Sequence, residues 1–446
     1  MIQIGTVVNA RKSLLRFEQV TPDPSWAFDY LKPSQTGYLT HSYHRYPAKF
    51  IPQLAQRLIT TLSEPGEWVL DPFMGSGTTL VEAKLLGRPS VGVDINPVAY
   101  LVSRAKVTPI PPGYLREKVH RLLDAIRTGE EQLSLFSEEP QMPEYYPEPA
   151  EENVQDRIRY WFAEPVLTRL WHIHQAIEQE QDEAVLYFFR CAFSNILKPC
   201  SYWHNRSVKP TRDLNKQIPD PLVLLQMQLR KMMKGNEQYF NRLQVHHVLD
   251  IPAIPYCADA RALPVEDGSI SLIVTSPPYV TSYEYADLHQ LTVLWYRYAQ
   301  DLREFRPQFI GTAAVNGKEA DAQSDLADQI VQQLAQRNRK KAAEVAIYFG
   351  EMRQCFTEMY RVLREGGRAC IVIGNTAIGK VPILNAQVFV EQMEGMGFVL
   401  EDLILREIPS KILPTTRDSK TGKFARVDDA DAHAYPHEYI LILRKI

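Results

Sequence analysis

The sequence has few cysteines, no long apolar run and no excess of basic charge. Its five cysteines show no Cys-x-x-Cys spacing, which argues against a disulfide framework or a zinc site. No stretch approaches the ~18 consecutive apolar residues of a membrane-spanning helix, and the first residues do not read as a secretory leader. Lys and Arg total 50 against 53 Asp and Glu, so a polyanion site must come from local clustering. We expect a soluble, cytoplasmic protein with no metal and no membrane contact.

The length and the composition indicate several packed units. At roughly 150 residues per domain, 446 residues suggest two or three domains, and 45% hydrophobic residues exclude wholesale disorder. Residues 130–156 contain nine acidic residues, four prolines and no Lys or Arg, which predicts an exposed linker or loop. Within the polar stretch 316–341 the apolar spacing predicts a helix with one shared face, formed by Leu326, Ile330, Val331 and Leu334.

Strand-like and helix-like runs alternate along most of the chain. Short apolar strands are expected at 68–71 and 90–96 with a helix between them, and residues 160–243 are helix-rich. Strands return after residue 248, one of them following a turn at Gly366-Gly367. The last two, at 398–408 and 437–446, have only a polar loop between them and suit an antiparallel hairpin at a sheet edge. We therefore predict an α/β fold with an open, mostly parallel sheet, interrupted by a helical insertion.

The first chemical motif lies directly between a strand and a helix. Its sequence, DPFMGSGTT at 71–79, has glycines at 75 and 77 that let the backbone approach a ligand at the carboxyl edge of a sheet. It lacks the Lys of a P-loop and the third glycine of a dinucleotide motif. Asp94 follows Gly77 by seventeen residues, where such folds hydrogen-bond a ribose. This combination predicts a nucleoside-cofactor site.

The second chemical motif closes an apolar strand with TSPPY at 275–279. Two prolines end strand pairing and stiffen the backbone. What remains for a ligand is the hydroxyl of Ser276, rigid carbonyls and the ring of Tyr279. An exocyclic amino group of a nucleobase can donate to those acceptors while the ring of the base stacks on the tyrosine. Such stacking stabilises a bound base by ~1–3 kcal/mol. A proline-stiffened surface turn is the alternative for this motif taken alone.

Together the two motifs resemble the paired signature of amino-group DNA methyltransferases, the N4-cytosine and N6-adenine enzymes that use S-adenosylmethionine. The resemblance extends to HSYHRYPAKFIPQLAQRLI (41–59), GVDINP (92–97), CADARALP (257–264), VLREGGRACIVIGN and the terminal HEYILILRK. It covers roughly residues 38–107 and 248–446. Ser271 stands where the family usually has an acid, at a position before the strand. The implied fold is a Rossmann-like methyltransferase with a seven-stranded sheet and a reversed final hairpin.

The resemblance also implies roles for single residues. Asp94 would bind the ribose and Asp259 the adenine of the cofactor. Other residues of the motifs would line the same pocket: Tyr46, Lys49, Asp71, Pro72, Phe73, Gly75, Gly77, Thr78 and Asn96. The target base would be held by the catalytic motif, formed by Ser276, Pro277, Pro278 and Tyr279.

Double-stranded DNA is the expected partner, and the insertion is the best candidate for reading it. Residues 198–234 carry eight basic residues against two acids. Phosphate-binding charges interleaved with aromatic and amide groups suit DNA contact. The expected DNA-binding residues are Lys198, Tyr202, Trp203, His204, Arg206, Lys209 and Arg212. A solvated loop is the alternative, and a second candidate segment, 282–298, has aromatic residues at the spacing of a packed core. We expect residues 1–107 and 248–446 to form the methyltransferase domain and 108–247 the linker and insertion.

The activity expected from these observations is methylation of an exocyclic amine in DNA by base flipping. An uncharged serine at 276 favours cytosine N4 over adenine N6, as in site-specific enzymes of restriction-modification systems, which can have a cognate endonuclease as partner. Methylation of RNA and a catalytically silent DNA-binding subunit are weaker alternatives. Pro199-Cys200 matches the dipeptide of cytosine C5 enzymes, but the chain also has a complete SPPY motif. We therefore do not expect Cys200 to be a nucleophile.

Overall fold

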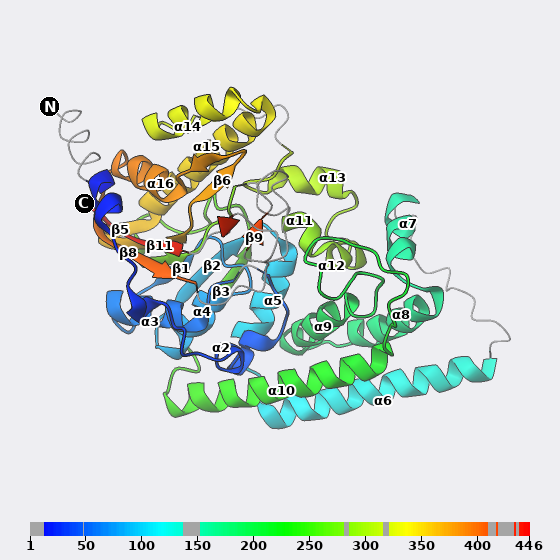
Figure 1. The fold of residues 1–446 in the computed structure, drawn as a ribbon. Helices are drawn as coiled ribbons and strands as arrows, with labels where there is room; N and C mark the ends of the chain where they lie inside the picture. The colour runs from blue at the N-terminus through cyan, green and yellow to red at the C-terminus, as the bar shows by residue number, and fades with distance from the viewer. Residues whose placement is uncertain are drawn as a thin grey trace.

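The computed structural model describes residues 13–47, 49–136, 152–280, 285–314, 321–408, 416–417, 432–433 and 437–446. Its centre is a seven-stranded sheet in the order β3-β2-β1-β4-β5-β11-β8 (Figure 1). Six of its strands run in the same direction, and β11 runs antiparallel between β5 and β8. The strand bounds are β1 Val69–Asp71, β2 Ser90–Asp94, β3 Ala253–Cys257, β4 Ile270–Thr275, β5 Leu363–Ile373, β8 Phe398–Glu407 and β11 His437–Lys445.

Alternate residues of the central strands supply the two faces of the sheet, because successive side chains of a strand point to opposite sides. On one face, Val69 and Leu272 join a cluster with α3 (Pro52–Leu62). On the other, Leu70 and Ile273 join a cluster with α15 (Arg339–Val362) and α16 (Asn385–Glu394). The central strands β1 and β4 are mainly apolar because both of their faces are covered. The helix α14 (Asp325–Ala335) lies on the same face as α15 and α16 and packs against α15.

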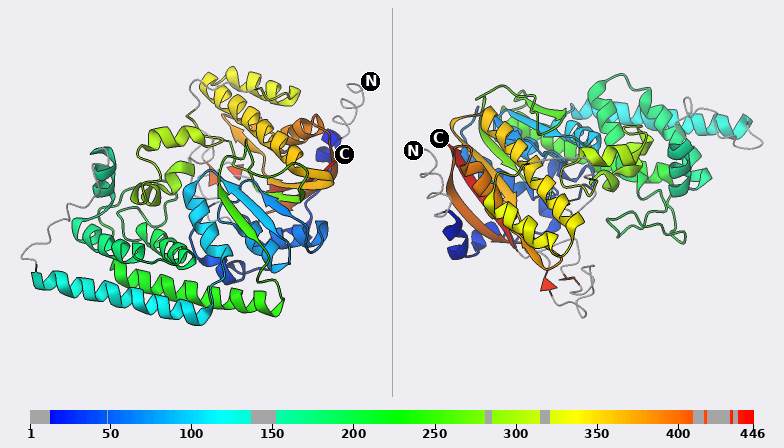
Figure 2. Two further views of the ribbon diagram at one scale, coloured as in Figure 1. Left: turned by 180° about the vertical axis from the view of Figure 1, so that it is seen from behind. Right: turned by 90° about the horizontal axis from the view of Figure 1, so that it is seen from above.

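A helical insertion lies beside the sheet and has a core of its own (Figures 1 and 2). It comprises α6 (Pro112–Phe136), α7 (Glu152–Trp161), α8 (Glu164–Glu178), α9 (Glu183–Leu197) and α10 (Pro221–Val245). Its apolar residues are continuous with those of α5 (Pro97–Val107), the helix after β2. Helices after the second motif pack onto the same core: α11 (Tyr285–Leu288), α12 (Gln290–Trp295) and α13 (Leu302–Phe305).

The remaining elements are short. They are the helical residues 13–19, η1 (Pro24–Trp26), α2 (Pro33–Thr36), η2 (Leu39–Ser42), α4 (Thr78–Leu85), η3 (Arg306–Gln308) and the strand pairs β6 (Thr376–Ile378) with β7 (Val381–Ile383) and β9 (Thr416–Arg417) with β10 (Ala432–His433). None of the helices in the described residues is both long and apolar enough to cross a membrane.

The predicted sheet and its reversed final hairpin are confirmed, as is the helix with Leu326, Ile330, Val331 and Leu334 on its packed side. Two local predictions are wrong. The acidic stretch 130–156 is not a linker throughout, because α6 extends to Phe136 and α7 begins at Glu152; residues 137–151 lie outside the described ones. The expected turn at Gly366-Gly367 lies within β5, where the pairing register with β4 shifts and Gly366 takes φ of 73°.

Candidate functional site

The two chemical motifs meet at neighbouring strand ends, although nearly two hundred positions separate them in the sequence. β1 and β4 pair in parallel, with Leu70 opposite Ile273, so both motifs leave the sheet at its carboxyl edge. Asp71 connects them directly: its carboxylate accepts hydrogen bonds from Thr79 at 2.7 Å and from Thr275 at 2.7 Å. Its side chain is buried, and desolvation raises its pKa to about 6. Because Asp71 is only 2% exposed and both of its oxygens are engaged, it joins the motifs and does not face a ligand.

The Gly-rich turn after Asp71 is held closely against the elements below it. Gly77 has φ of 70°, and a Cβ there would lie 2.8 Å from the Ser103 hydroxyl oxygen, so only glycine fits. The backbone carbonyl of Gly75 accepts a hydrogen bond from Ser103 at 3.0 Å. The ammonium group of Lys106, fully buried on α5, donates to the Ser76 carbonyl oxygen at 2.5 Å. Nothing in the motif itself identified Lys106, because it lies thirty residues further on.

Asp94 ends β2 beside this turn, where the sequence predicts it. Its carboxylate accepts the backbone N–H of Gly75 at 3.0 Å and that of Asn96 at 2.9 Å. Burial raises its pKa to about 6, while the two N–H donors act in the opposite direction. Asn96 caps α5 by accepting the Val98 N–H at 3.0 Å. The acid and the turn therefore form one hydrogen-bonded unit.

Asp259 follows β3, which pairs with β2 so that Cys257 lies opposite Asp94. Its carboxylate is held by the guanidinium of Arg261, at 2.6 Å from Oδ2 to Nη2. Arg261 also pairs with Glu351 of α15 at 2.7 Å. Asp259 thus lies beside the predicted cofactor site with its carboxylate fixed by an ion pair.

The catalytic motif is stiffened from three sides. The carbonyl of Pro278 accepts the hydroxyl of Tyr348 at 2.9 Å. The Tyr279 hydroxyl accepts the N–H of Gly374 at 3.1 Å and lies 3.3 Å from the Glu438 carboxylate. By contrast, the hydroxyl of Ser276 makes no hydrogen bond within the described residues, and its side chain is partly exposed. One free acceptor therefore stands among fixed neighbours.

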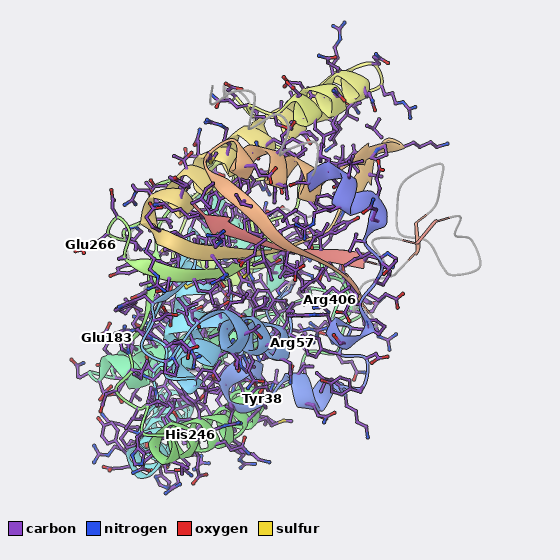
Figure 3. The ribbon with its side chains drawn as sticks, turned by 90° about the vertical axis from the view of Figure 1, so that its left-hand side faces the viewer. Tyr38, Arg57, Glu183, His246, Glu266 and Arg406 are labelled. Atoms are coloured by element: carbon purple, nitrogen blue, oxygen red, sulfur yellow. The ribbon has the colours of Figure 1, made fainter. Side chains whose placement is uncertain are left out.

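The N-terminal segment forms one wall of the site. The Tyr46 ring lies 3.2 Å from where a Cβ of Gly75 would be, and it stacks on His289 with ring centroids 4.6 Å apart. Lys49 donates to the His41 carbonyl at 2.8 Å. Tyr38, labelled in Figure 3, and His41 both bind the buried carboxylate of Glu82, at 2.6 and 2.7 Å. His289 lies ten positions after the catalytic motif, and sequence reasoning did not select it.

The predicted DNA-binding residues lie on a hairpin loop between α9 and α10. The loop is closed by the bridge between Trp203 and Arg212 and by the His204 N–H donating to the Thr211 carbonyl at 2.8 Å. Arg206, Lys209 and Arg212 are exposed. Figure 2 shows this loop projecting from the body in the view from above.

The prediction for Trp203 requires correction. Its side chain is 1% exposed and stacks on Trp161 with ring centroids 5.4 Å apart, so it belongs to the core of the insertion. Lys198 is directed inward as well: its ammonium group donates to the Ser207 carbonyl at 2.7 Å. Tyr202 is half-buried with Arg212 over its ring at 5.3 Å. An aromatic residue in a basic segment can serve folding as readily as base contact, and the sequence does not distinguish the two.

Other candidate residues are structural. Cys200 is fully buried, and burial raises the pKa of its thiol to about 12, so it is no nucleophile. In the second candidate segment, Trp295 and Tyr296 pack in the core of the insertion, and residues 281–284 lie outside the described ones. No group of acidic, His or Cys side chains among the described residues has metal-binding geometry.

The sheet order with a reversed last hairpin, and a Gly-rich turn tied to an acid at the next strand end, define a Rossmann-like methyltransferase. Comparison with known proteins narrows this class. A family model described as DNA methylase, of the N6 and N4 type, matches residues 9–104 and 270–446. Because this is more than half of the chain, the protein belongs to that family, the S-adenosylmethionine-dependent DNA amino-methyltransferases.

Several relatives share this similarity. Type II methyltransferase M.MvaI of Kocuria varians is 27% identical over 416 residues, which span 87% of this chain and 88% of the relative. DNA adenine methyltransferase YhdJ of Escherichia coli is 37% identical over 78 residues, 18% of this chain and 25% of its own. Among solved structures, a SAM-dependent methyltransferase from Methanosarcina mazei aligns over 90% of this chain and 99% of its own, with 9% identity and a TM-score of 0.29.

Proposed function

We propose that this DNA methyltransferase transfers a methyl group from S-adenosylmethionine to the N4 amino group of a specific cytosine in double-stranded DNA. The observation that carries the proposal is the contact between the two motifs through Asp71, which brings the end of the Gly-rich turn beside Ser276. A cofactor bound over the turn would therefore lie next to a base held by the catalytic motif.

The residues around the turn fit a nucleoside cofactor. Close packing on Tyr46 and Ser103 holds the turn at Gly75 and Gly77, and the buried Thr78 hydroxyl has no hydrogen-bond partner among the described residues. Asp94, partly exposed at the sheet edge, suits a ribose diol. Asp259 is proposed for the adenine amino group, and the surrounding wall for the rest of the cofactor: Tyr46, Lys49, Pro72, Phe73 and Asn96. When bound, the cofactor supplies an electrophilic methyl group on a sulfonium.

The protein's own contribution is positioning. The Ser276 hydroxyl oxygen and the carbonyl of Pro277 can accept the two hydrogens of an exocyclic amine, and the Tyr279 ring can stack on the base. Since Pro278 and Tyr279 are each hydrogen-bonded to neighbouring elements, these acceptors are pre-oriented. The aniline-like nitrogen needs no prior deprotonation: as its bond to the methyl carbon would form, the carbon–sulfur bond of the sulfonium would break and one amine proton would pass to solvent. Fixed geometry therefore supplies most of the rate.

An uncharged hydroxyl at position 276 is the feature that favours cytosine N4. Adenine N6 is the second candidate, because one similar protein is a DNA adenine methyltransferase. We further propose that residues 108–247 form the target-recognition region, with DNA contacts from Arg206, Lys209 and Arg212, and that a restriction endonuclease accompanies the enzyme.

Incubation with tritiated cofactor and plasmid DNA, with RNA as a parallel substrate, followed by nucleoside analysis, tests the proposal. The expected product is N4-methylcytosine. N6-methyladenine would establish the second candidate, and label in RNA alone or in neither nucleic acid would refute both.

A further inference from the structure

Three segments of this slightly acidic chain contain no Asp or Glu at all: residues 30–63, 184–212 and 221–236. They hold twelve of the 50 basic residues, so all 53 acids and the other 38 basic residues lie elsewhere. Arg57 and Arg190 have local partners, in Ser25 and Glu178. The twelve are Lys32, Arg45, Lys49, Arg57, Arg190, Lys198, Arg206, Lys209, Arg212, Arg230, Lys231 and Lys234.

The fold brings the three segments together. Asn195 of α9 accepts the backbone N–H of Arg45 at 2.9 Å, and its amide donates to Gln228 of α10 at 2.9 Å. Gln228 in turn donates to the Tyr43 carbonyl at 2.5 Å. A Cβ on Gly235 would lie 2.4 Å from the Leu39 carbonyl oxygen, so η2 lies directly on α10. Figure 1 shows α9 and α10 beside each other below the sheet.

Two cations at this junction are exposed and have no acidic partner among the described residues. Arg45 follows Tyr43 by two residues, and Lys231 lies about one turn after Gln228 on α10. The pKa of Lys49 is lowered to about 8, mainly by desolvation and further by the charge of Lys231. The nearest acids along α10 are engaged elsewhere: Asp220 pairs with Arg169, and Glu237 pairs with Arg116 at 3.3 Å.

This junction is also close to the site. Tyr46, adjacent to Arg45, contacts the Gly-rich turn at Gly75, and α9 leads directly into the hairpin loop that carries Arg206, Lys209 and Arg212. Cations gathered without counter-charges repel one another in the folded protein, and a polyanion removes that repulsion while releasing its own counterions.

We propose that Arg45 and Lys231 bind backbone phosphates of the DNA substrate, on an acid-free surface that these two residues form together with Arg206, Lys209 and Arg212. The inference rests on the proposed function for the identity of the polyanion. Arg45 and Lys231 would thus form a second phosphate-binding element, next to the cofactor wall, in addition to the hairpin loop. Phosphate contacts of this kind fix the position of a duplex on the protein and carry no sequence information.

The test is the salt dependence of DNA binding by the full-length double variant Arg45→Gln/Lys231→Gln. Fluorescence anisotropy with a labelled 30-bp DNA duplex of mixed sequence would be measured between 50 and 250 mM salt. Each phosphate contact contributes about 0.9 to the slope of log K against log salt, so we expect the slope to fall by about 2. The control, Arg364→Gln/Arg368→Gln, removes two cations of β5 that pair with Glu67 and Glu401, and its slope should remain that of the wild type.

An unchanged slope in the double variant, or an equal fall in the control, would overturn the assignment. So would a loss of cofactor affinity by calorimetry as large as the loss of DNA affinity, because the cations would then serve the cofactor carboxylate. Tighter binding of a 30-bp RNA duplex than of DNA would also count against it. Methyl transfer by the wild type to plasmid DNA is measured separately: its absence with the expected slopes would reject the proposed function and not the surface.

Discussion

Ser276 differs from its neighbours in having an unused hydrogen-bonding group. Tyr348 fixes the carbonyl of Pro278, and Gly374 fixes the hydroxyl of Tyr279, whereas the serine hydroxyl has no partner among the described residues. A free polar group among fixed ones, at the end of a buried strand, is available to a ligand and contributes nothing visible to the fold. Substitution at this residue should therefore separate catalysis from stability.

We expect Ser276→Ala to lower the rate of methyl transfer about 10- to 100-fold, because one acceptor for the amine is lost, at ~1.4–3 kcal/mol. Cofactor affinity and melting temperature should not change. Ser271→Ala, at the start of the same strand, is the matched control. The measurement is tritium transfer to plasmid DNA. A variant as active as the wild type would show that Ser276 does not hold the amine, and no transfer by either protein would support a catalytically silent DNA-binding subunit.

Asp94 carries the predicted contact with the cofactor ribose. Asp94→Ala should weaken S-adenosylmethionine binding severalfold or more, both by losing that contact and by releasing the N–H of Gly75. Isothermal calorimetry measures the affinity directly. Glu266→Ala, in the exposed turn between β3 and β4 (Figure 3), removes a carboxylate away from the site and should bind as the wild type does. Equal affinities for all three proteins would refute the ribose assignment.

At the scale of elements, the hairpin loop after α9 is held by a residue that its own motif does not contain. Lys216 donates from one ammonium group to the carbonyls of Lys198, Ser201 and Trp203, at 2.9, 2.6 and 2.8 Å. Desolvation lowers its pKa to about 8. Three backbone acceptors on one cation fix the base of the loop, while Arg206 and Lys209 lie exposed near its tip.

Lys216→Met should release this loop without unfolding the protein. Hydrogen–deuterium exchange of the amides of His204 and Asp213, which are bonded across the loop, should accelerate tenfold or more. DNA affinity should fall with it because the exposed cations lose their fixed positions. Lys209→Met removes the same charge at the tip and should weaken DNA binding with exchange rates unchanged. Slow exchange in both variants would show that Lys216 does not order the loop.

The sequence identified long or strongly patterned elements better than short ones. The sheet strands and α14 follow from apolar runs and spacing. The β6–β7 pair escapes prediction because each strand has only three residues. The ends of the acidic stretch form helices because α6 and α7 gain apolar contacts through Ile126 and Ile158 that composition does not reveal. Of the site, both motifs were predictable, but Lys106, Tyr348 and His289 were not, since each lies outside both motifs and reaches the site only through the fold.

At the scale of the whole molecule, the carboxyl edge of the sheet concentrates buried acids. Asp71 and Asp94 have pKa values raised to about 6, and Glu82 to about 7, each chiefly by desolvation. In the unfolded chain an aspartate titrates near 3.9. The folded state therefore binds these protons more tightly than the unfolded state. Their contribution to the free energy of unfolding is largest below about pH 4 and is lost as the pH rises through about 6.

Replacing Asp71 by Asn should remove its share of this dependence. Between pH 4 and 7 the free energy of unfolding of the wild type should fall relative to that of Asp71→Asn. The expected fall is about 3 kcal/mol, because the pKa of Asp71 is about two units higher in the folded state than in the unfolded state. Urea denaturation at pH 4.5, 5.5 and 7 measures the difference. Parallel profiles for the two proteins would mean that Asp71 titrates alike in the folded and unfolded states.

The sequence alone determined the class of fold, the two motifs and the family, because alternating apolar runs and short residue patterns are local properties. Tertiary structure decided which side chains of the motifs remain available. Asp71 links β1 to β4 by hydrogen bonds, and Trp203 packs on Trp161, so neither is available to a ligand. The hydroxyl of Ser276, by contrast, has no hydrogen-bond partner among the described residues. It also decided that three acid-free segments contact one another. Burial, hydrogen-bond partners and net local charge depend on which distant residues pack together, and no local pattern specifies that.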